Sequence, residues 1–113
     1  MHRFDRTFNA VQHKRRHFRQ TENAVLSYTI NWAALLGSDT ISTSTWTAEQ
    51  SGVTISGQAI SANVTTATLM ADVGVYTVVN KIVTAAGLTD ERIIELAVTD
   101  NNEFTSRSED YPL

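Results

Sequence analysis

Two histidines spaced four residues apart are the first side chains in this sequence that could do chemistry. His13 and His17 would share one face of a helix, where two imidazoles can bind a metal ion. Arg15 and Arg16 lie between them, and no acidic third ligand is near. Because neighbouring positive charge raises the cost of binding a divalent cation, the pattern indicates contact residues and no metal site.

No other combination of side chains offers an enzyme mechanism. All three histidines lie before the part of the chain that we expect to form a rigid scaffold. Their position disfavours a serine–histidine–acid triad. Asp90 and Glu91 are adjacent, and neighbours on a strand point to opposite faces, so they would not flank one substrate bond together. The five glycines are isolated, without a phosphate-binding loop. We therefore expect no enzyme, no cofactor and no metal.

Composition narrows the class of protein further. The chain has 113 residues and no cysteine, which fits one domain with tails and excludes a disulfide or a thiolate nucleophile. No run approaches the roughly 18 to 20 apolar residues of a membrane span. Charges occupy the N-terminus, where a secretory signal would need an apolar core. We expect a chain that neither spans a membrane nor is exported.

The scaffold that must position any functional residue is predicted from a long β-branched alternation. From Val75 to Thr84 the second residue of each pair is Tyr76, Val78, Asn80, Ile82 or Thr84, which predicts one buried strand face. A turn at Ala85–Leu88 and a second alternation from Thr89 to Val98 complete a hairpin, with Gly87 suited to positive φ. The charges Asp90, Glu91 and Arg92 are expected at its solvated end.

Asp72-x-Gly74-x-Tyr76, just before this hairpin, resembles the entry to the penultimate strand of immunoglobulin-like sandwiches. In those folds a tyrosine hydroxyl bonds back to upstream backbone as a tyrosine corner. The alternative is any antiparallel hairpin with a buried tyrosine. We expect Tyr76 and Trp46 to be buried.

Shorter strand patterns precede the hairpin and complete the prediction. They lie at residues 24–32, 40–48, 52–56, 59–61 and 63–70, with a helical turn at 33–37 that ends in Gly37. The predicted fold class is all-β: an antiparallel immunoglobulin-like β-sandwich at residues 24–98, with an N-terminal basic docking arm at 1–23 and a C-terminal acidic tail at 99–113.

Charge separates the predicted arm from the rest. Residues 1–20 carry six cations and one acid, a balance of +5, whereas the other residues carry three cations and eleven acids, a balance of −8. Aromatic and apolar residues at helical spacing favour a basic amphipathic helix, and an extended leader is the alternative. The predicted partner-binding residues are Phe4, Phe8, Lys14, Arg15, Arg16, Phe18 and Arg19.

A family resemblance follows from three segments: 24–32, 36–46 and Gly87-Leu88-Thr89-Asp90-Glu91-Arg92. Together they make residues 24–98 similar to small virion proteins of tailed bacteriophages, the fibre–tail adaptor or neck and tail accessory proteins. The resemblance implies an immunoglobulin-like module with a structural role in the virion. It also implies protein–protein docking to other virion proteins, as a homo-oligomer or ring.

Two function classes remain open at this stage. The leading one is a virion structural adaptor, and the alternative is a free-standing immunoglobulin-like module that binds carbohydrate or another host surface ligand. Carbohydrate platforms need exposed aromatic rings, whereas Trp32 and Trp46 fall on predicted inward faces. A nucleic-acid partner for the basic arm is less favoured than a protein, because a −8 body repels a polyanion.

Overall fold

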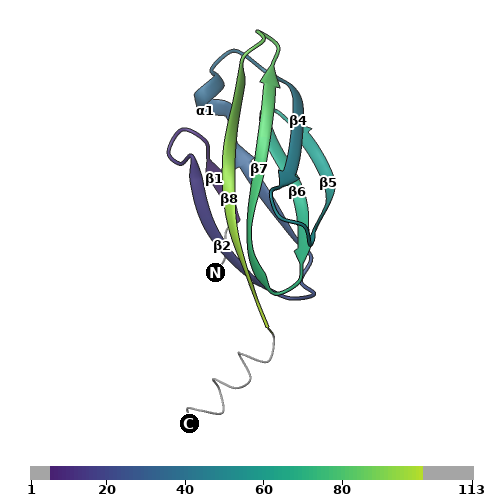
Figure 1. The fold of residues 1–113 in the computed structure, drawn as a ribbon. Helices are drawn as coiled ribbons and strands as arrows, with labels where there is room; N and C mark the ends of the chain where they lie inside the picture. Colours follow the sequence, from purple (N-terminus) through teal and green to yellow (C-terminus); the bar gives the residue numbers. More distant parts are fainter. Residues whose placement is uncertain (1–5, 101–113) are drawn as a thin grey trace.

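The alternating residues form eight strands and one short helix in the computed structural model, which describes residues 6–100 (Figure 1). The strands are rich in threonine and β-branched residues, which pack well on a pleated surface. The elements are β1 Thr7–Asn9, β2 Arg15–Thr21, β3 Leu26–Asn31, α1 Ala33–Leu36, β4 Ile41–Ala48, β5 Val53–Ser61, β6 Val64–Ala71, β7 Gly74–Thr84 and β8 Thr89–Thr99.

Two four-stranded sheets face each other. Sheet A has the strand order β1-β3-β6-β5, and sheet B has the order β2-β8-β7-β4. Four of the six strand pairs are antiparallel, and the parallel pairs are β1–β3 and β2–β8, both at the edge formed by the start of the chain. The predicted all-β immunoglobulin-like sandwich is confirmed.

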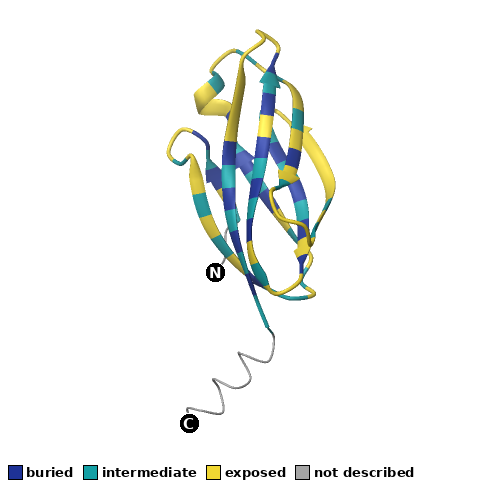
Figure 2. Cartoon of the chain, viewed as in Figure 1, coloured by how far each residue is buried: buried dark blue, intermediate teal, exposed yellow. Residues whose placement is uncertain are grey.

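The long hairpin supplies the largest share of the core. Tyr76 to Thr84 on β7 and Arg92 to Val98 on β8 alternate between buried and more exposed side chains, as Figure 2 shows by colour. The fully buried members include Val78, Ile82, Ile94 and Leu96. Trp46 is 3% exposed and Tyr76 is 7% exposed, so the predicted burial of both aromatic residues is confirmed.

The tyrosine corner is also present. The Tyr76 hydroxyl donates a hydrogen bond of 2.8 Å to the carbonyl oxygen of Asp72. A Cβ at Gly74 would lie 3.0 Å from that hydroxyl, and Gly74 has a φ of +155°, so a larger residue would push the ring away. The glycine therefore gives the tyrosine room to close the loop between the sheets.

The N-terminal segment corrects one expectation. Residues 7–9 and 15–21 are strands, not a helix or a leader, and they pair with β3 and β8. Phe8 is 3% exposed in the core, and the ring of Phe18 packs edge-on to Tyr28 with centroids 5.2 Å apart. Residues 6–23 therefore belong to the sandwich and are not a separate arm, because two of their segments are strands of its sheets and Phe8 and Ala10 are buried in its core.

Smaller differences concern β5 and α1. The two short strands expected around Gly57 are one strand with a register shift between Ser56 and Ala59. The helical turn ends at Gly37 with a φ of 61°, as predicted.

Across residues 6–100, no helix has the length and hydrophobicity needed to cross a membrane. Phe4 and the sequence 101–113, most of the predicted acidic tail, lie outside the described residues.

Candidate interaction surface

The histidines are not arranged for metal binding. His13 precedes β2 and its ring lies edge-on to Phe8, with centroids 6.5 Å apart, whereas His17 is exposed on β2. Within residues 6–100, no group of three or more histidine and acidic side chains is placed to hold a metal ion.

Polar side chains in the core form a hydrogen-bond network. Trp32 Nε1 donates to Thr65 Oγ1 at 3.1 Å and to Asn80 Oδ1 at 3.2 Å, and Thr65 donates to the same Asn80 oxygen at 2.7 Å. The Asn80 amide group donates to Ser44 Oγ at 2.9 Å. Each bond joins residues of the two sheets or of neighbouring strands, so the network fixes how the sheets face each other.

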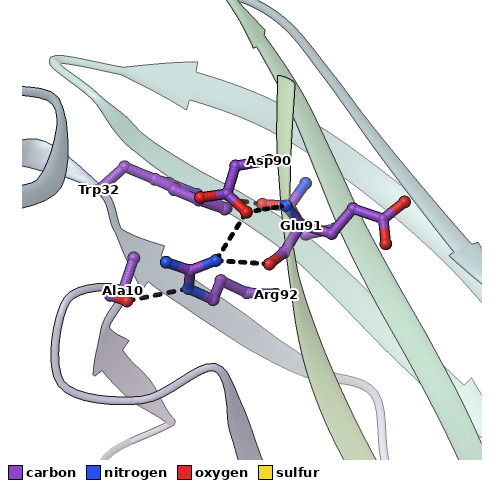
Figure 3. A network of polar contacts seen from close by, with 6 residues as sticks. Ala10, Trp32, Asp90, Glu91 and Arg92 are labelled. Carbon is purple, nitrogen blue, oxygen red and sulfur yellow. Dashed lines mark hydrogen bonds and ion pairs between the residues drawn. The ribbon is translucent and has the colours of Figure 1, made fainter. Parts of the chain in front are cut away.

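Arg92 connects the N-terminal segment to the hairpin (Figure 3). Its side chain is 4% exposed, its Nε donates to the carbonyl oxygen of Ala10 at 2.8 Å, and its Nη1 bonds Asp90 Oδ1 at 2.9 Å. The guanidinium also lies 5.0 Å from the ring centre of Trp32. The expectation that Arg92 is solvated is wrong, because its position on the inward face of β8 buries it.

A second buried contact holds β2 against sheet A. Tyr28 donates from its hydroxyl to Gln20 Oε1 at 2.5 Å, and Gln20 Nε2 donates to the carbonyl oxygen of Leu69 at 3.3 Å. Burial raises the pKa of Tyr28 from 10 to about 12, although the positive charge of Arg6 partly offsets this. The Tyr28 hydroxyl therefore remains a neutral donor at physiological pH.

Basic side chains gather on β2 and at the residue before it, and we define them as the basic edge: Lys14, Arg15, Arg16, His17 and Arg19. Lys14, Arg15, His17 and Arg19 are exposed, and Arg16 is half-buried with its guanidinium 5.4 Å from the ring centre of Phe18. Arg15 forms an ion pair with Glu95 on the neighbouring strand β8. For Lys14 and Arg19, the described part of the chain holds no ion-pair partner.

A shallow groove of about 450 Å³ lies beside the basic edge on the outer face of sheet B. Its lining combines charged and apolar side chains: His17, Phe18, Arg19, Val75, Glu95 and Ala97. Val75 is an apolar side chain, and its position on the outer face of the sheet leaves it 70% exposed. The groove therefore places positive charge next to apolar surface.

The structure brings together most of the predicted partner-binding residues; the exceptions are Phe4, which lies outside the described residues, and Phe8. Lys14, Arg15, Arg16 and Arg19 lie on the basic edge, and Phe18 contributes to the groove. Phe8 is a core residue, which corrects its predicted docking role. Val75 and Glu95 were missed by sequence reasoning, and their outward positions in the two alternations were the available signal.

The outer face of sheet A differs in chemistry from that of sheet B. Its outward positions carry hydroxyl, amide or apolar side chains, with hydroxyl pairs such as Ser27–Thr68 at 3.1 Å and Thr29–Thr66 at 3.4 Å. No ionisable residue occupies an outward position on strands β1, β3, β5 or β6. The cations at residues 14–19 are therefore on the edge formed by β2 and not on this neutral face.

One end of the sandwich is acidic. The turns β2–β3, β4–β5 and β6–β7 meet at the end where β8 finishes, because Thr21 pairs with Thr99 and Gly74 pairs with Val98. These turns and the end of β8 contribute Glu22, Glu49, Asp72 and Asp100. The loops contain no lysine or arginine, so this acidic end opposes the basic edge in charge.

The two facing sheets and the tyrosine corner define an immunoglobulin-like module. The solution structure of the PKD domain from KIAA 1837 protein matches it with a TM-score of 0.51, at 20% sequence identity, over 73% of this chain and 79% of that chain. That likeness concerns the fold alone. None of the curated protein sequences matches the chain.

The family profile described as podophage GP4 fiber-tail adaptor protein gp77 matches residues 20–97. The chain therefore belongs to this family of phage fibre–tail adaptor proteins, as the resemblance read from the sequence implied. It is a structural protein of the virion. A structural adaptor family also points to a protein that is not an enzyme.

Proposed function

We propose that this chain is an adaptor subunit that joins the fibre and tail assembly by docking its basic edge on an acidic surface of a neighbouring virion protein. The single observation that carries the proposal is the alignment of Arg15, His17 and Arg19 along one exposed edge strand, with Lys14 directly before it. Membership of the fibre–tail adaptor family supports a partner inside the virion. Opposite charges speed encounter and fix orientation, which suits an assembly joint.

A second copy of the chain is one such partner. Its acidic end carries Glu22, Glu49 and Asp72 in exposed or half-buried turns, and these carboxylates complement the basic edge. A contact between two different surfaces of identical subunits is head-to-tail, and such contacts close into rings when the rotation permits. The charge distribution therefore favours a homo-oligomeric ring.

The experiment changes two exposed cations of the basic edge, Lys14 and Arg19, that have no ion pair within the described residues. A Lys14→Glu/Arg19→Glu variant keeps the Arg15–Glu95 pair and the packing of Phe18, so we expect it to fold normally. Supplied to a phage that lacks its own copy, it should yield particles without the adaptor or without fibres. The readouts are the protein content of purified particles and their electron-microscopy images.

Lys81→Glu is the matched control, because Lys81 is an exposed cation on β7, two strands away from β2 in the same sheet. This control should assemble as the unchanged chain does. Normal particles from the Lys14→Glu/Arg19→Glu variant would overturn the proposal, and the interface would then be sought on the neutral face of sheet A.

A further inference from the structure

We propose that the basic edge binds its partner by strand addition: an extended segment with acidic residues at every second position pairs with the free side of β2. This inference deepens the proposed function by naming the chemistry of the partner at the same site. An edge strand presents unpaired backbone groups to any chain that can supply a further strand.

β2 has a free side with regular geometry. Among residues 6–100 it is the outermost strand of sheet B and pairs only with β8, without a register shift over its seven residues. Ile93 N donates to the carbonyl oxygen of Lys14, and Glu22 N donates to the carbonyl oxygen of Thr99, so the even-numbered residues of this stretch face β8. Backbone groups alternate along a strand, which leaves those of Arg15, His17 and Arg19 pointing away from β8.

The other three edge strands offer less. β1 has three residues, and β5 is interrupted by its bulge. On β4 the backbone N–H groups of Ile41 and Trp46 already donate to the side chains of Asn63 and Gln58. In the part of the chain from residue 6 to 100, β2 is thus the edge with both a regular backbone and side chains of one charge.

The side chains of Arg15, His17 and Arg19 set the chemistry of the added strand. They project to the outer face of sheet B, at a repeat of about 6.6 to 6.8 Å for every second residue of a strand. Residues of an added strand that lie opposite them project to the same face. Carboxylates at every second position would therefore meet a cation or a histidine at each step.

β8 already shows this contact on the other side of β2. Glu95 lies opposite His17 in the register and forms an ion pair with Arg15, which is two residues before His17 on the same face of β2. Arg19 has no such carboxylate within the described residues. An acidic strand on the free side would supply the missing partner.

The test uses the full-length chain and short synthetic peptides. The probe is Thr-Glu-Val-Glu-Val-Glu-Thr, and the matched control has the same composition with its three glutamates in consecutive positions. Two further peptides keep the probe sequence but carry N-methyl groups, one on the glutamates and the other on the residues between them. Because backbone N–H groups alternate between the two sides of a strand, only one of these two peptides loses the donors that face β2. Affinity is measured by titration, and backbone amide hydrogen exchange is measured by NMR.

Strand addition predicts that the probe slows amide exchange at Arg15, His17 and Arg19, and at no residue of β5. It also predicts at least about tenfold weaker binding for the consecutive-glutamate peptide and for one of the two N-methylated peptides, with the other close to the probe. Equal binding of all four peptides, or binding without slowed exchange on β2, would overturn the inference. Tighter binding of a single-stranded oligonucleotide of equal charge would overturn the choice of a protein partner. These outcomes are independent of particle assembly, so the inference and the proposed adaptor role can fail separately.

Discussion

At the scale of single residues, the buried polar groups decide how the sandwich closes. Asn80 lies at the centre of β7 with 0% exposure and receives or donates hydrogen bonds to both sheets. Arg92 has the same role at the edge, where it holds Ala10 and packs against Trp32. Such groups cost free energy unless they are fully bonded, so their partners restrict the packing to one arrangement.

The tyrosine corner gives the prediction at this scale. Tyr76→Phe removes the hydroxyl that donates to the Asp72 carbonyl but keeps the ring between Gly52 and Gly74. The free energy of unfolding should fall by about 0.5 to 1.5 kcal/mol, the net value of one hydrogen bond. Urea unfolding followed by tryptophan fluorescence measures it. An unchanged midpoint would show that the corner bond adds nothing to stability.

At the scale of elements, the strands predicted from alternation are those of the structure from β3 to β8. Tyr28, Ile30 and Trp32 share the buried face that the sequence indicated, and so do the inward residues of β7 and β8. These strands could be predicted because apolar residues at every second position identify both the strand and its inner face.

β2 could not be predicted in the same way. Its inward positions are Arg16, Phe18 and Gln20, so two of the three residues facing the core are polar or charged. Phe4, Phe8, Val11 and Phe18 also fit a helical spacing, which competed with the strand pattern. The pairing that decides the matter joins residue 15 to residue 93, and nothing local to the segment indicates so distant a partner.

The integration of the N-terminal strands predicts a stability effect. Phe8 is 3% exposed and contacts Phe18, with ring centroids 6.3 Å apart, so Phe8→Ala should lower the free energy of unfolding by about 3 to 5 kcal/mol. Val11→Ala, at a side chain that is 53% exposed, is the control and should change it by less than about 0.5 kcal/mol. Thermal or urea unfolding compares them. Equal stability of the two variants would mean that β1 is not part of the core.

At the scale of the whole molecule, charge is distributed by region. The basic edge lies along β2, the acidic end lies where β8 finishes, and the outer face of sheet A is neutral. A subunit with two oppositely charged surfaces can contact neighbours on two sides, whereas a uniformly charged one repels its own copies. This arrangement suits a protein that connects others.

The last prediction concerns salt. The core is apolar and hydrogen-bonded, so the free energy of unfolding of the isolated chain should change little between about 0.05 and 0.5 M sodium chloride. The basic edge is solvent-exposed, and the Debye length falls from about 10 Å at 0.1 M salt to about 3 Å at 1 M, so docking at that edge should weaken steeply. The rate at which purified chain adds to adaptor-deficient particles, measured over this range, should fall at least about tenfold.

The Lys14→Glu/Arg19→Glu variant should add slowly at every salt concentration, and the slope of its rate against salt concentration should be smaller. Lys81→Glu should keep the slope of the unchanged chain. The same slope for all three chains would place the docking contact away from β2. Only the Lys14→Glu/Arg19→Glu variant lacks two of the cations on that edge, so a contact at β2 would give it a different slope.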